Sequence, residues 1–323
     1  EIMPSLVGSE MCIRDSLIYS SPATLAFNSP GAEGFGVKRA GLAIPDSIML
    51  IVAPGCCGRN TSMISSMPQY EDRFFYLTMD ETDIVTGRHL KKIPKAVEEI
   101  CNCCEKRPSV VMICITCVDA LLGTDMERVC RKAEERAGLP VRPCYMYALT
   151  REGRKPPMVH VRQSIYSLLE PKKKKGNVVN LLGFFSPLMD DCELYGMLEK
   201  AGVKTIHEIS RCKDYEEYQT MAEANFNLVL HPEARFAAED FHENLKIPFI
   251  ELRRLYQIDK ITKQYQALSN VLGILFEDRE AEAAALEAVE RLKSAKPDAV
   301  FAIGECMNGD PFELALALVK YGF

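Results

Sequence analysis

The stretch Ser109-Val110-Val111-Met112-Ile113-Cys114-Ile115-Thr116-Cys117 decides the fold of this 323-residue chain. The run Ser109–Ile115 is apolar at nearly every position, which is typical of a strand buried on both faces of its sheet. A helical pattern follows over Val118–Ala137 and ends at Gly138. The stretch therefore predicts a buried parallel strand, followed by a helix that crosses back over the sheet.

The same alternation continues along the chain. Strand-like runs occur at Ser47–Ala53, Phe74–Met79, Pro140–Cys144, Asn177–Gly183, Val203–Ile209, Phe226–Leu230, Pro248–Leu252 and Asp298–Ile303. Helical patterns occur at Lys91–Glu105, Leu188–Ala201, Tyr215–Ala224, Glu233–Asn244, Asp259–Phe276, Asp278–Ala295 and Pro311–Lys320. Strands that alternate with helices indicate parallel sheets covered by helices on both faces. We therefore predict an α/β fold of repeated doubly wound, Rossmann-like domains, two nearly complete and a third truncated.

Both ends of the chain bear on the domain division. Residues 1–16 resemble a translated sequencing-adapter read, so we leave them out of the fold. We expect a cluster-binding domain over residues 17–171, a second α/β domain over 176–257, and the start of a truncated third over 258–323. A further strand should follow the last helical pattern, and we expect the chain to be a fragment.

Composition and charge exclude several classes of protein. Asp and Glu (45) outnumber Lys and Arg (39), and a formal net charge of −6 argues against nucleic-acid binding. No apolar stretch approaches about 18 residues, so we expect no membrane association. Thirteen cysteines in a chain of this size, without a signal peptide, indicate a reducing cytoplasm rather than a disulfide scaffold.

Common nucleotide-binding and hydrolase motifs are absent from the sequence. There is no Gly-x-Gly-x-x-Gly after a strand and no Gly-x4-Gly-Lys-[Ser/Thr]. There is also no Gly-x-Ser-x-Gly and no His-Glu-x-x-His. The chain itself therefore shows no sign of binding ATP or a dinucleotide, or of acting as a hydrolase.

Two cysteines follow predicted strands at the start of helices. Cys57 follows Ser47–Ala53 after a Pro-Gly turn, and Cys117 follows Ser109–Ile115. Ligand sites in doubly wound sheets lie beyond the carboxyl ends of the strands, and amide groups at a helix start favour the thiolate form of cysteine. The two thiols either share a metal or cluster, or are two buried free cysteines.

A rival pattern is Cys101-x2-Cys104 with Cys114-x2-Cys117, a spacing found in structural zinc sites. The first pair ends a predicted helix, and Cys117 lies at the far end of the following strand. A strand of that length separates the two pairs by roughly 20 Å. We therefore expect no shared zinc site.

Four stretches together resemble segments of nitrogenase component 1 and its relatives. These relatives include cofactor-assembly scaffolds and the protochlorophyllide and nickel-tetrapyrrole reductases. The stretches are Gly31–Ala40, Ala53-Pro54-Gly55-Cys56-Cys57-Gly58, Asp80-Glu81-Thr82-Asp83-Ile84-Val85-Thr86-Gly87, and Thr116-Cys117 with Leu122-Gly123-Thr124-Asp125. The resemblance covers residues 17–323 and is specific as a set.

This resemblance implies an iron–sulfur cluster held between two subunits, with Cys57 and Cys117 among its ligands. The partner would be a second copy or a related component 1-like subunit. The third cysteine of the family has no counterpart in Leu17–Gly55. Either Cys56 substitutes for it, or two cysteines from each of two subunits hold one [4Fe-4S] cluster, which we favour because four thiolates complete such a cluster.

This sequence departs from the nitrogenase pattern in a second way. In true nitrogenase, a cysteine of the second domain holds the cofactor. The resemblance aligns that position with His231, which would ligate a metal of a second metallocofactor, donate a proton, or serve a structural role. Arg59 either faces the same cavity and attracts an anionic substrate, or is solvated. Without that cysteine we do not expect dinitrogen reduction.

The resemblance implies an oxidoreductase subunit that receives electrons from a separate ATP-dependent iron–sulfur reductase and passes them through its cluster to a bound substrate or cofactor. The alternative is a non-catalytic scaffold for assembly of a metallocluster of the iron–molybdenum-cofactor type. A third alternative is a thiol-rich α/β domain with zinc or no metal.

Overall fold

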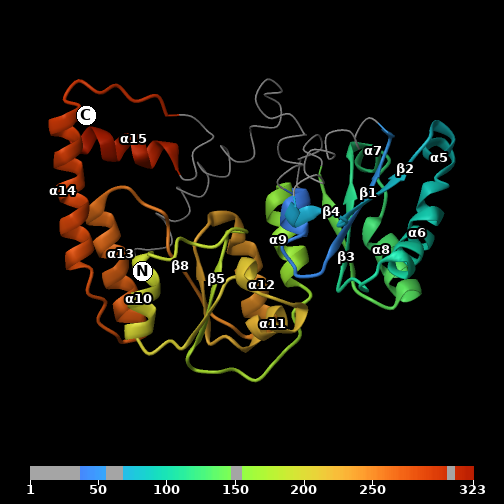
Figure 1. Cartoon of the computed structure of the whole chain (residues 1–323), viewed down its shortest axis with the longest axis horizontal. Helices are drawn as coiled ribbons and strands as arrows, with labels where there is room; N and C mark the ends of the chain where they lie inside the picture. The colour runs from blue at the N-terminus through green and yellow to red at the C-terminus, as the bar shows by residue number, and fades with distance from the viewer. Residues whose placement is uncertain (1–36, 56–67, 147–154, 304–309) are drawn as a thin grey trace. The chain divides into compact units, whose positions relative to one another are not determined.

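The computed structural model describes residues 37–55, 68–146, 155–303 and 310–323. Two four-stranded sheets lie in these ranges, with the strand orders β2-β1-β3-β4 and β6-β5-β7-β8 (Figure 1). Every strand pair is parallel. The prediction of an α/β fold with parallel sheets and flanking helices is therefore confirmed.

The first sheet consists of β1 (Ile48–Ala53), β2 (Phe74–Thr78), β3 (Val111–Ile115) and β4 (Val141–Tyr145). The central strands β1 and β3 are buried at every residue, as their continuous apolar sequences predicted. Their register pairs Val52 with Ile115. The chain therefore leaves β1 beside the point where it leaves β3.

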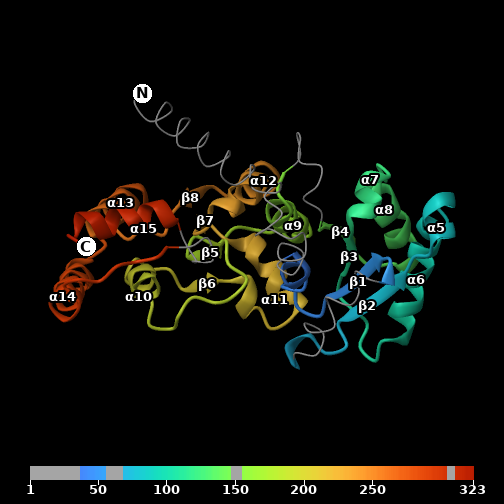
Figure 2. The same cartoon turned by 90° about the horizontal axis from the view of Figure 1, so that it is seen from above.

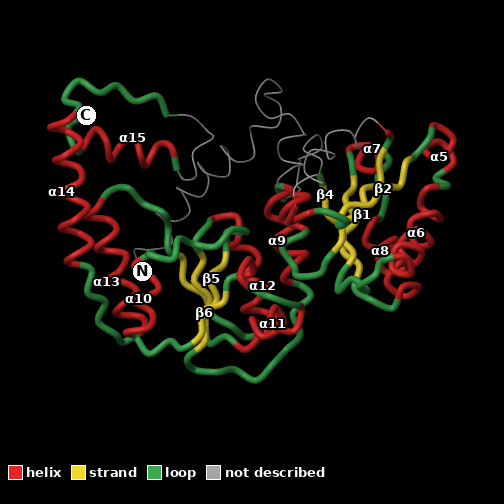
Figure 3. Tube along the Cα trace, in the orientation of Figure 1, coloured by secondary structure: helices red, strands yellow, loops and turns green. Residues whose placement is uncertain are grey.

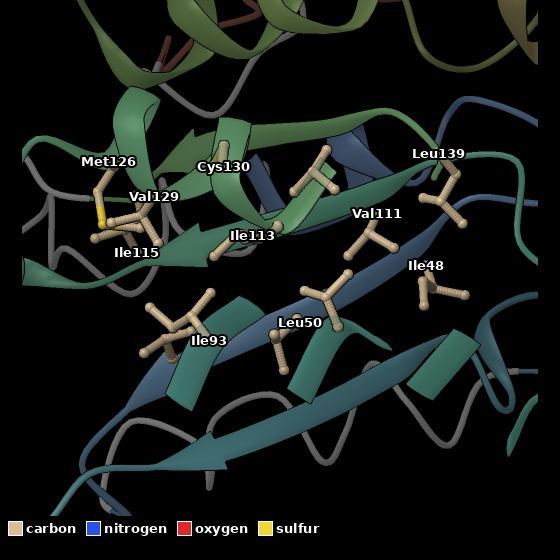
Figure 4. Packing of buried hydrophobic residues seen from close by; sticks show 14 of the residues in the cluster. Ile48, Leu50, Ile93, Val111, Ile113, Ile115, Met126, Val129, Cys130 and Leu139 are labelled. Atoms are coloured by element: carbon tan, nitrogen blue, oxygen red, sulfur yellow. The ribbon is translucent and has the colours of Figure 1, made fainter. Parts of the chain in front are cut away.

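Helices cover both faces of the first sheet. On one face, α6 (His89–Cys103) and α8 (Met126–Ala137) bury apolar residues such as Ile93 and Val129 against Leu50 and Ile113 of the strands (Figure 4). On the opposite face lies α9 (Pro157–Tyr166) (Figures 1 and 2). Two short helices, α5 (Glu81–Thr86) and α7 (Cys117–Leu121), follow β2 and β3 at the carboxyl edge of the sheet.

The second sheet consists of β5 (Val178–Leu182), β6 (Thr205–His207), β7 (Phe226–Val229) and β8 (Phe249–Glu251). One face packs against α10 (Glu193–Lys200) and α13 (Ile258–Leu272), through residues such as Leu198 and Leu268. The next helix along the chain after β7 is α12 (Arg235–Leu245), which buries Ala237, Ala238 and Phe241. The chain ends with α14 (Arg279–Ala295) and α15 (Pro311–Lys320), and Figure 3 shows how helix and strand alternate.

The chain forms two compact units that are not continuous in sequence. The first contains the described residues up to Glu170 together with Ile209–Thr220, a segment that includes α11 (Tyr215–Thr220). The Tyr218 hydroxyl in this segment donates to the Ile165 carbonyl of α9 within the same unit. The second unit contains Pro171–Glu208 and the described residues after Met221. A segment between β6 and β7 of the second sheet thus belongs to the first unit.

Two predicted elements differ in the structure. The helix predicted over Val118–Ala137 is divided into α7 and α8, because Gly123 adopts a positive φ of 66° and Asp125 caps the second helix. The strand predicted over Asp298–Ile303 is wrong: these residues pair with no strand of the described chain, and Val300 is 96% exposed. An apolar run becomes a strand only where a neighbour accepts its hydrogen bonds.

Within the described ranges, every helix is too short or too polar to span a lipid bilayer.

Candidate functional site

Cys117 lies at the carboxyl edge of the first sheet. It is the first residue of α7, it follows β3 after Thr116, and its side chain is partly buried. Because β1 is the neighbour of β3, the chain leaves β1 at Pro54 and Gly55 beside Thr116 and Cys117. The predicted site residues Cys56, Cys57 and Arg59 come next in the sequence and lie outside the described residues.

A buried polar pair supports the turn that begins at Cys117. The Nε2 atom of His89 lies 2.9 Å from Oδ1 of Asp119, and both side chains are only 1% exposed. The Nδ1–H of His89 donates to the carbonyl oxygen of Asp83, 3.0 Å away. His89 at the start of α6 therefore joins the loop after β2 to the helix after β3.

The loop after β2 is fixed by its own ion pairs. Asp80 and Asp83 form a reciprocal capping box at the start of α5, and Gly87 ends that helix with a positive φ of 64°. Both oxygens of Asp83 are bonded, Oδ2 by Lys92 at 2.7 Å and Oδ1 by Arg88 at 2.6 Å. These two hydrogen bonds hold the pKa of Asp83 well below its usual range. The Asp80–Gly87 segment thus forms a rigid support for His89.

Two buried oxygen atoms close to Cys117 in sequence have no hydrogen-bond partner among the described residues. They are Oγ1 of Thr116, which is fully buried, and Oδ2 of Asp119. A buried hydroxyl normally finds a partner, because an unpaired polar group costs free energy. Cluster sulfurs in proteins commonly accept hydrogen bonds, which tune the cluster potential. A partly buried thiol beside a buried, unpaired hydroxyl fits an iron–sulfur ligand position.

The other described cysteines do not gather into a metal site. Burial raises the pKa of the thiols of Cys101, Cys104, Cys130, Cys144, Cys192 and Cys212. Among the residues that the structure describes, no three or more His, Cys, Asp or Glu side chains are placed to hold a metal ion. This holds for the four thiols of the two Cys-x2-Cys pairs, which all lie in the described ranges.

His231 lies at the carboxyl edge of the second sheet, directly after β7. Gly183 after β5 approaches it closely, and the rings of Phe184 and His231 are in edge-to-face contact at 5.7 Å. The Nδ1 atom of His231 accepts a hydrogen bond from the Glu233 N–H at 3.3 Å. A neutral ring whose Nδ1 accepts carries its hydrogen on Nε2. Metal-binding histidines show the reverse pattern, in which the second nitrogen donates; here Nε2 is a hydrogen-bond donor.

Charged side chains surround the same edge of the second sheet. The guanidinium carbon of Arg254 lies 5.0 Å from the centroid of the Phe184 ring. Arg235 lies 3.4 Å from Glu251 at the end of β8 and 3.1 Å from Glu239. The Phe184 ring thus contacts both the His231 ring and the Arg254 guanidinium at this edge of the sheet.

Sequence reasoning missed His89, Asp119 and Arg254. His89 and Asp119 are 30 positions apart, and neither belongs to a recognisable spacing. The available signal was indirect, because His89 is one of only five histidines in the chain and Asp119 follows Cys117 closely.

Several curated proteins that are similar to the chain are named nitrogenase iron-molybdenum cofactor biosynthesis proteins. The nitrogenase iron-molybdenum cofactor biosynthesis protein NifE of a Nostoc species is 29% identical over 76% of this chain and 53% of the relative. The NifE protein of Rhizobium meliloti is 28% identical over 79% of this chain and 54% of the relative. This chain thus spans about half the length of the curated relatives that it matches.

Solved structures and a family model agree on the fold. A structure described as nitrogenase Cp1 at pH 6.5 superposes with a TM-score of 0.62 at 18% identity, over 89% of this chain and 68% of the other. A second, nitrogenase Cp1 at pH 5, gives 0.53 at 22% identity, over 81% of this chain and 55% of the other. The model of the family described as nitrogenase component 1 type oxidoreductase matches residues 33–305. Since that match spans most of the sequence, the chain belongs to the nitrogenase component 1 type oxidoreductase family.

Proposed function

We propose that this chain is a component 1-type oxidoreductase subunit in which Cys117 and Cys57 hold an iron–sulfur cluster. The observation that carries the proposal is the register of β1 against β3, because Pro54 and Gly55, which precede Cys57 in sequence, leave β1 beside Thr116 and Cys117. A second subunit, identical or related, would supply two further thiolates and complete a [4Fe-4S] cluster. Cys56 is the alternative third ligand from this chain.

The proposed role of the cluster is one-electron transfer between a reductase and a bound substrate. The reductase would be a separate ATP-dependent iron–sulfur protein, since this sequence has no phosphate-binding loop of its own. The strands β1 and β3, which precede the two cysteines in sequence, are buried at every residue and would anchor them to the sheet. Free thiols of this number suit a reducing cytoplasm, where we place the protein.

We propose that His231 contacts the substrate or a second metallocofactor, and that Arg59 attracts an anionic substrate. The hydrogen-bond pattern of His231 supports a role in which its Nε2–H donates a hydrogen bond to the bound molecule; the ring gives a proton only from its imidazolium form. Arg254, in contact with Phe184, adds positive charge at the same sheet edge. An anionic or electron-rich substrate fits this combination.

A metallocluster assembly scaffold is the second candidate function. The observation that favours it is the chain's similarity to the NifE proteins, which are iron–molybdenum cofactor biosynthesis proteins. A scaffold would use the same cysteines to hold a cluster and then release a product to another protein. The two functions therefore share a cluster site. Electron transfer passes electrons on from that site, whereas a scaffold releases a metallocluster product.

The domain division over 17–171, 176–257 and 258–323 stays a proposal, which differs from the compact units in two places: Ile209–Thr220 belongs to the first unit, and α13 packs on the second sheet. The segment 258–323 exposes large apolar side chains, among them Leu275 at 78%, Phe312 at 66% and Val319 at 68%. Apolar surface of this kind commonly packs against further structure.

Two measurements on anaerobically purified full chain test and separate these functions. In the first, an ATP-dependent iron–sulfur reductase is added with ATP, and the cluster is followed by electron paramagnetic resonance. Reduction that requires ATP hydrolysis supports electron transfer, and a non-hydrolysable ATP analogue is the control. In the second, ⁵⁵Fe-loaded chain is mixed with cofactor-free nitrogenase component 1; transfer of label supports the scaffold. If neither ATP-dependent reduction nor transfer of label occurs, both proposed functions are contradicted.

A further inference from the structure

The buried contact between His89 and Asp119 is the strongest polar feature that the proposed function leaves unexplained. We propose that these two residues are positioning residues, which fix the first turn of α7 and with it the thiol of Cys117. The proposal rests on the proposed function in one respect only, namely that Cys117 is the group whose position matters.

Asp119 is the anchor of α7. Its Oδ1 atom takes the His89 contact at 2.9 Å and also accepts a hydrogen bond from the Thr124 hydroxyl at 3.0 Å. Its backbone carbonyl accepts from the Thr124 N–H at 3.1 Å. One side chain thus joins α7 to the start of α6 and closes the turn that leads to α8.

Among the described side chains of α7, few others hold the helix that carries Cys117 in place. It has five residues, and a helix so short is unstable in isolation. Leu121 is 71% exposed and Leu122, directly after the helix, is 50% exposed, so neither contributes much burial. Val118 packs partly against the core. Asp119, at 1% exposure, is therefore the main attachment of this turn to the unit.

His89 is itself held firmly, which makes it a suitable partner. Its Nδ1–H donates to the carbonyl of Asp83, whose carboxylate is bonded by Lys92 and Arg88. The chain of contacts runs from the loop after β2, through the His89 ring, to the helix after β3. Loss of His89 would release α7 without disturbing the strands below it.

The test uses the full chain after metal removal, so that the readout does not depend on a bound cluster. The rate of alkylation of each cysteine by iodoacetamide is followed by peptide mass spectrometry in wild type, His89→Ala and Asp119→Asn. Exposed Cys103 gives the reference rate, and fully buried Cys114 and Cys144 report opening of the whole unit. His242→Ala, at an exposed position of α12, is the matched control.

In His89→Ala we expect Cys117 to react about tenfold faster, the equivalent of one lost buried hydrogen bond, while Cys114 and Cys144 stay protected. Asp119→Asn keeps a side chain of the same shape whose amide N–H donates to Nε2 of a neutral His89 ring, so we expect a smaller acceleration than in His89→Ala. An unchanged rate at Cys117 in His89→Ala, or equal acceleration at Cys114 and Cys144, would overturn the proposal.

A second readout uses the loaded protein. If Cys117 is a ligand, His89→Ala should retain iron but shift the electron paramagnetic resonance signal of the cluster, because the sulfur moves. Iron that survives Cys117→Ala would refute the proposed ligand role and leave the alkylation result standing. Failure of the ligand role of Cys117 and failure of the positioning role of His89 therefore give different results.

Discussion

Gly183 is packed directly against His231. A Cβ atom on Gly183 would lie 2.7 Å from both Cβ and the backbone nitrogen of His231, and Gly183 has a φ of 136°. Only glycine adopts such a backbone conformation at little cost. The close approach brings the ends of β5 and β7 together and sets the position of the His231 backbone.

Replacement of Gly183 should therefore be costly. We expect Gly183→Ala to lower the free energy of unfolding by about 2 kcal/mol or more, from backbone strain and steric overlap. Urea denaturation, followed by circular dichroism, measures this free energy of unfolding. The matched control is Gly196→Ala in α10, an exposed position with open space around its Cα. At Gly196 the substitution should raise the free energy of unfolding by about 0.5–1 kcal/mol. Equal stability of Gly183→Ala and wild type would refute the packing argument.

Asn180 and Asn227 form a buried pair on the neighbouring strands β5 and β7. The side-chain amide of Asn180 donates to Oδ1 of Asn227 at 2.7 Å and to the Met221 carbonyl at 2.9 Å. Both residues are fully buried. Loss of one partner leaves a buried polar group unpaired, which costs about 1–3 kcal/mol.

A double-mutant cycle tests this coupling. Asn180→Ala and Asn227→Ala should each destabilise the fold, and the double variant should lose about 0.5–3 kcal/mol less than the sum. Unfolding free energies from urea titrations give the four corners of the cycle. Additive losses would show that the amide contact contributes no coupling energy.

His160 of α9 should make stability depend on pH. Burial, with a smaller contribution from the positive charge of Lys155, lowers the pKa of His160 to about 4. The folded state therefore binds fewer protons than the unfolded state between that value and the ordinary histidine pKa of about 6.5. The stabilising contribution is present above about pH 6.5 and is lost as the pH falls towards 4.

The measurement compares wild type with His160→Gln at pH 7 and pH 5. We expect wild type to lose up to about 2 kcal/mol more than His160→Gln over this range. The other titrating groups are common to both proteins and cancel in the difference. Parallel pH profiles for the two proteins would contradict the assignment to His160.

Continuous apolar runs predicted the central strands well. Ile48–Ala53 and Val111–Ile115 became β1 and β3, because an apolar run between a helix and a turn suits a strand buried on both faces. The helices α5 and α9 were not predicted. The first has six residues, and the second includes buried Arg162 and Ser164, which blur its amphipathic pattern.

The contacts that shape the candidate site were beyond sequence reasoning. His89 meets Asp119 across 30 positions, and Asn180 meets Asn227 across 47. Such pairs depend on strand order and helix placement, which periodicity does not determine. Cys117 was predictable as a site residue because its position after a buried strand is a local feature. Its role as a ligand stays a prediction.

The most direct test of the account is the iron, acid-labile sulfide and zinc content per chain after anaerobic purification. Wild type, Cys57→Ala and Cys117→Ala are compared, with Cys103→Ala at an exposed thiol as the control. The account predicts about two irons and two sulfides per chain in wild type and Cys103→Ala, as in a [4Fe-4S] cluster shared by two chains, and loss in both ligand variants. Zinc, or no metal with all four proteins alike, would contradict it.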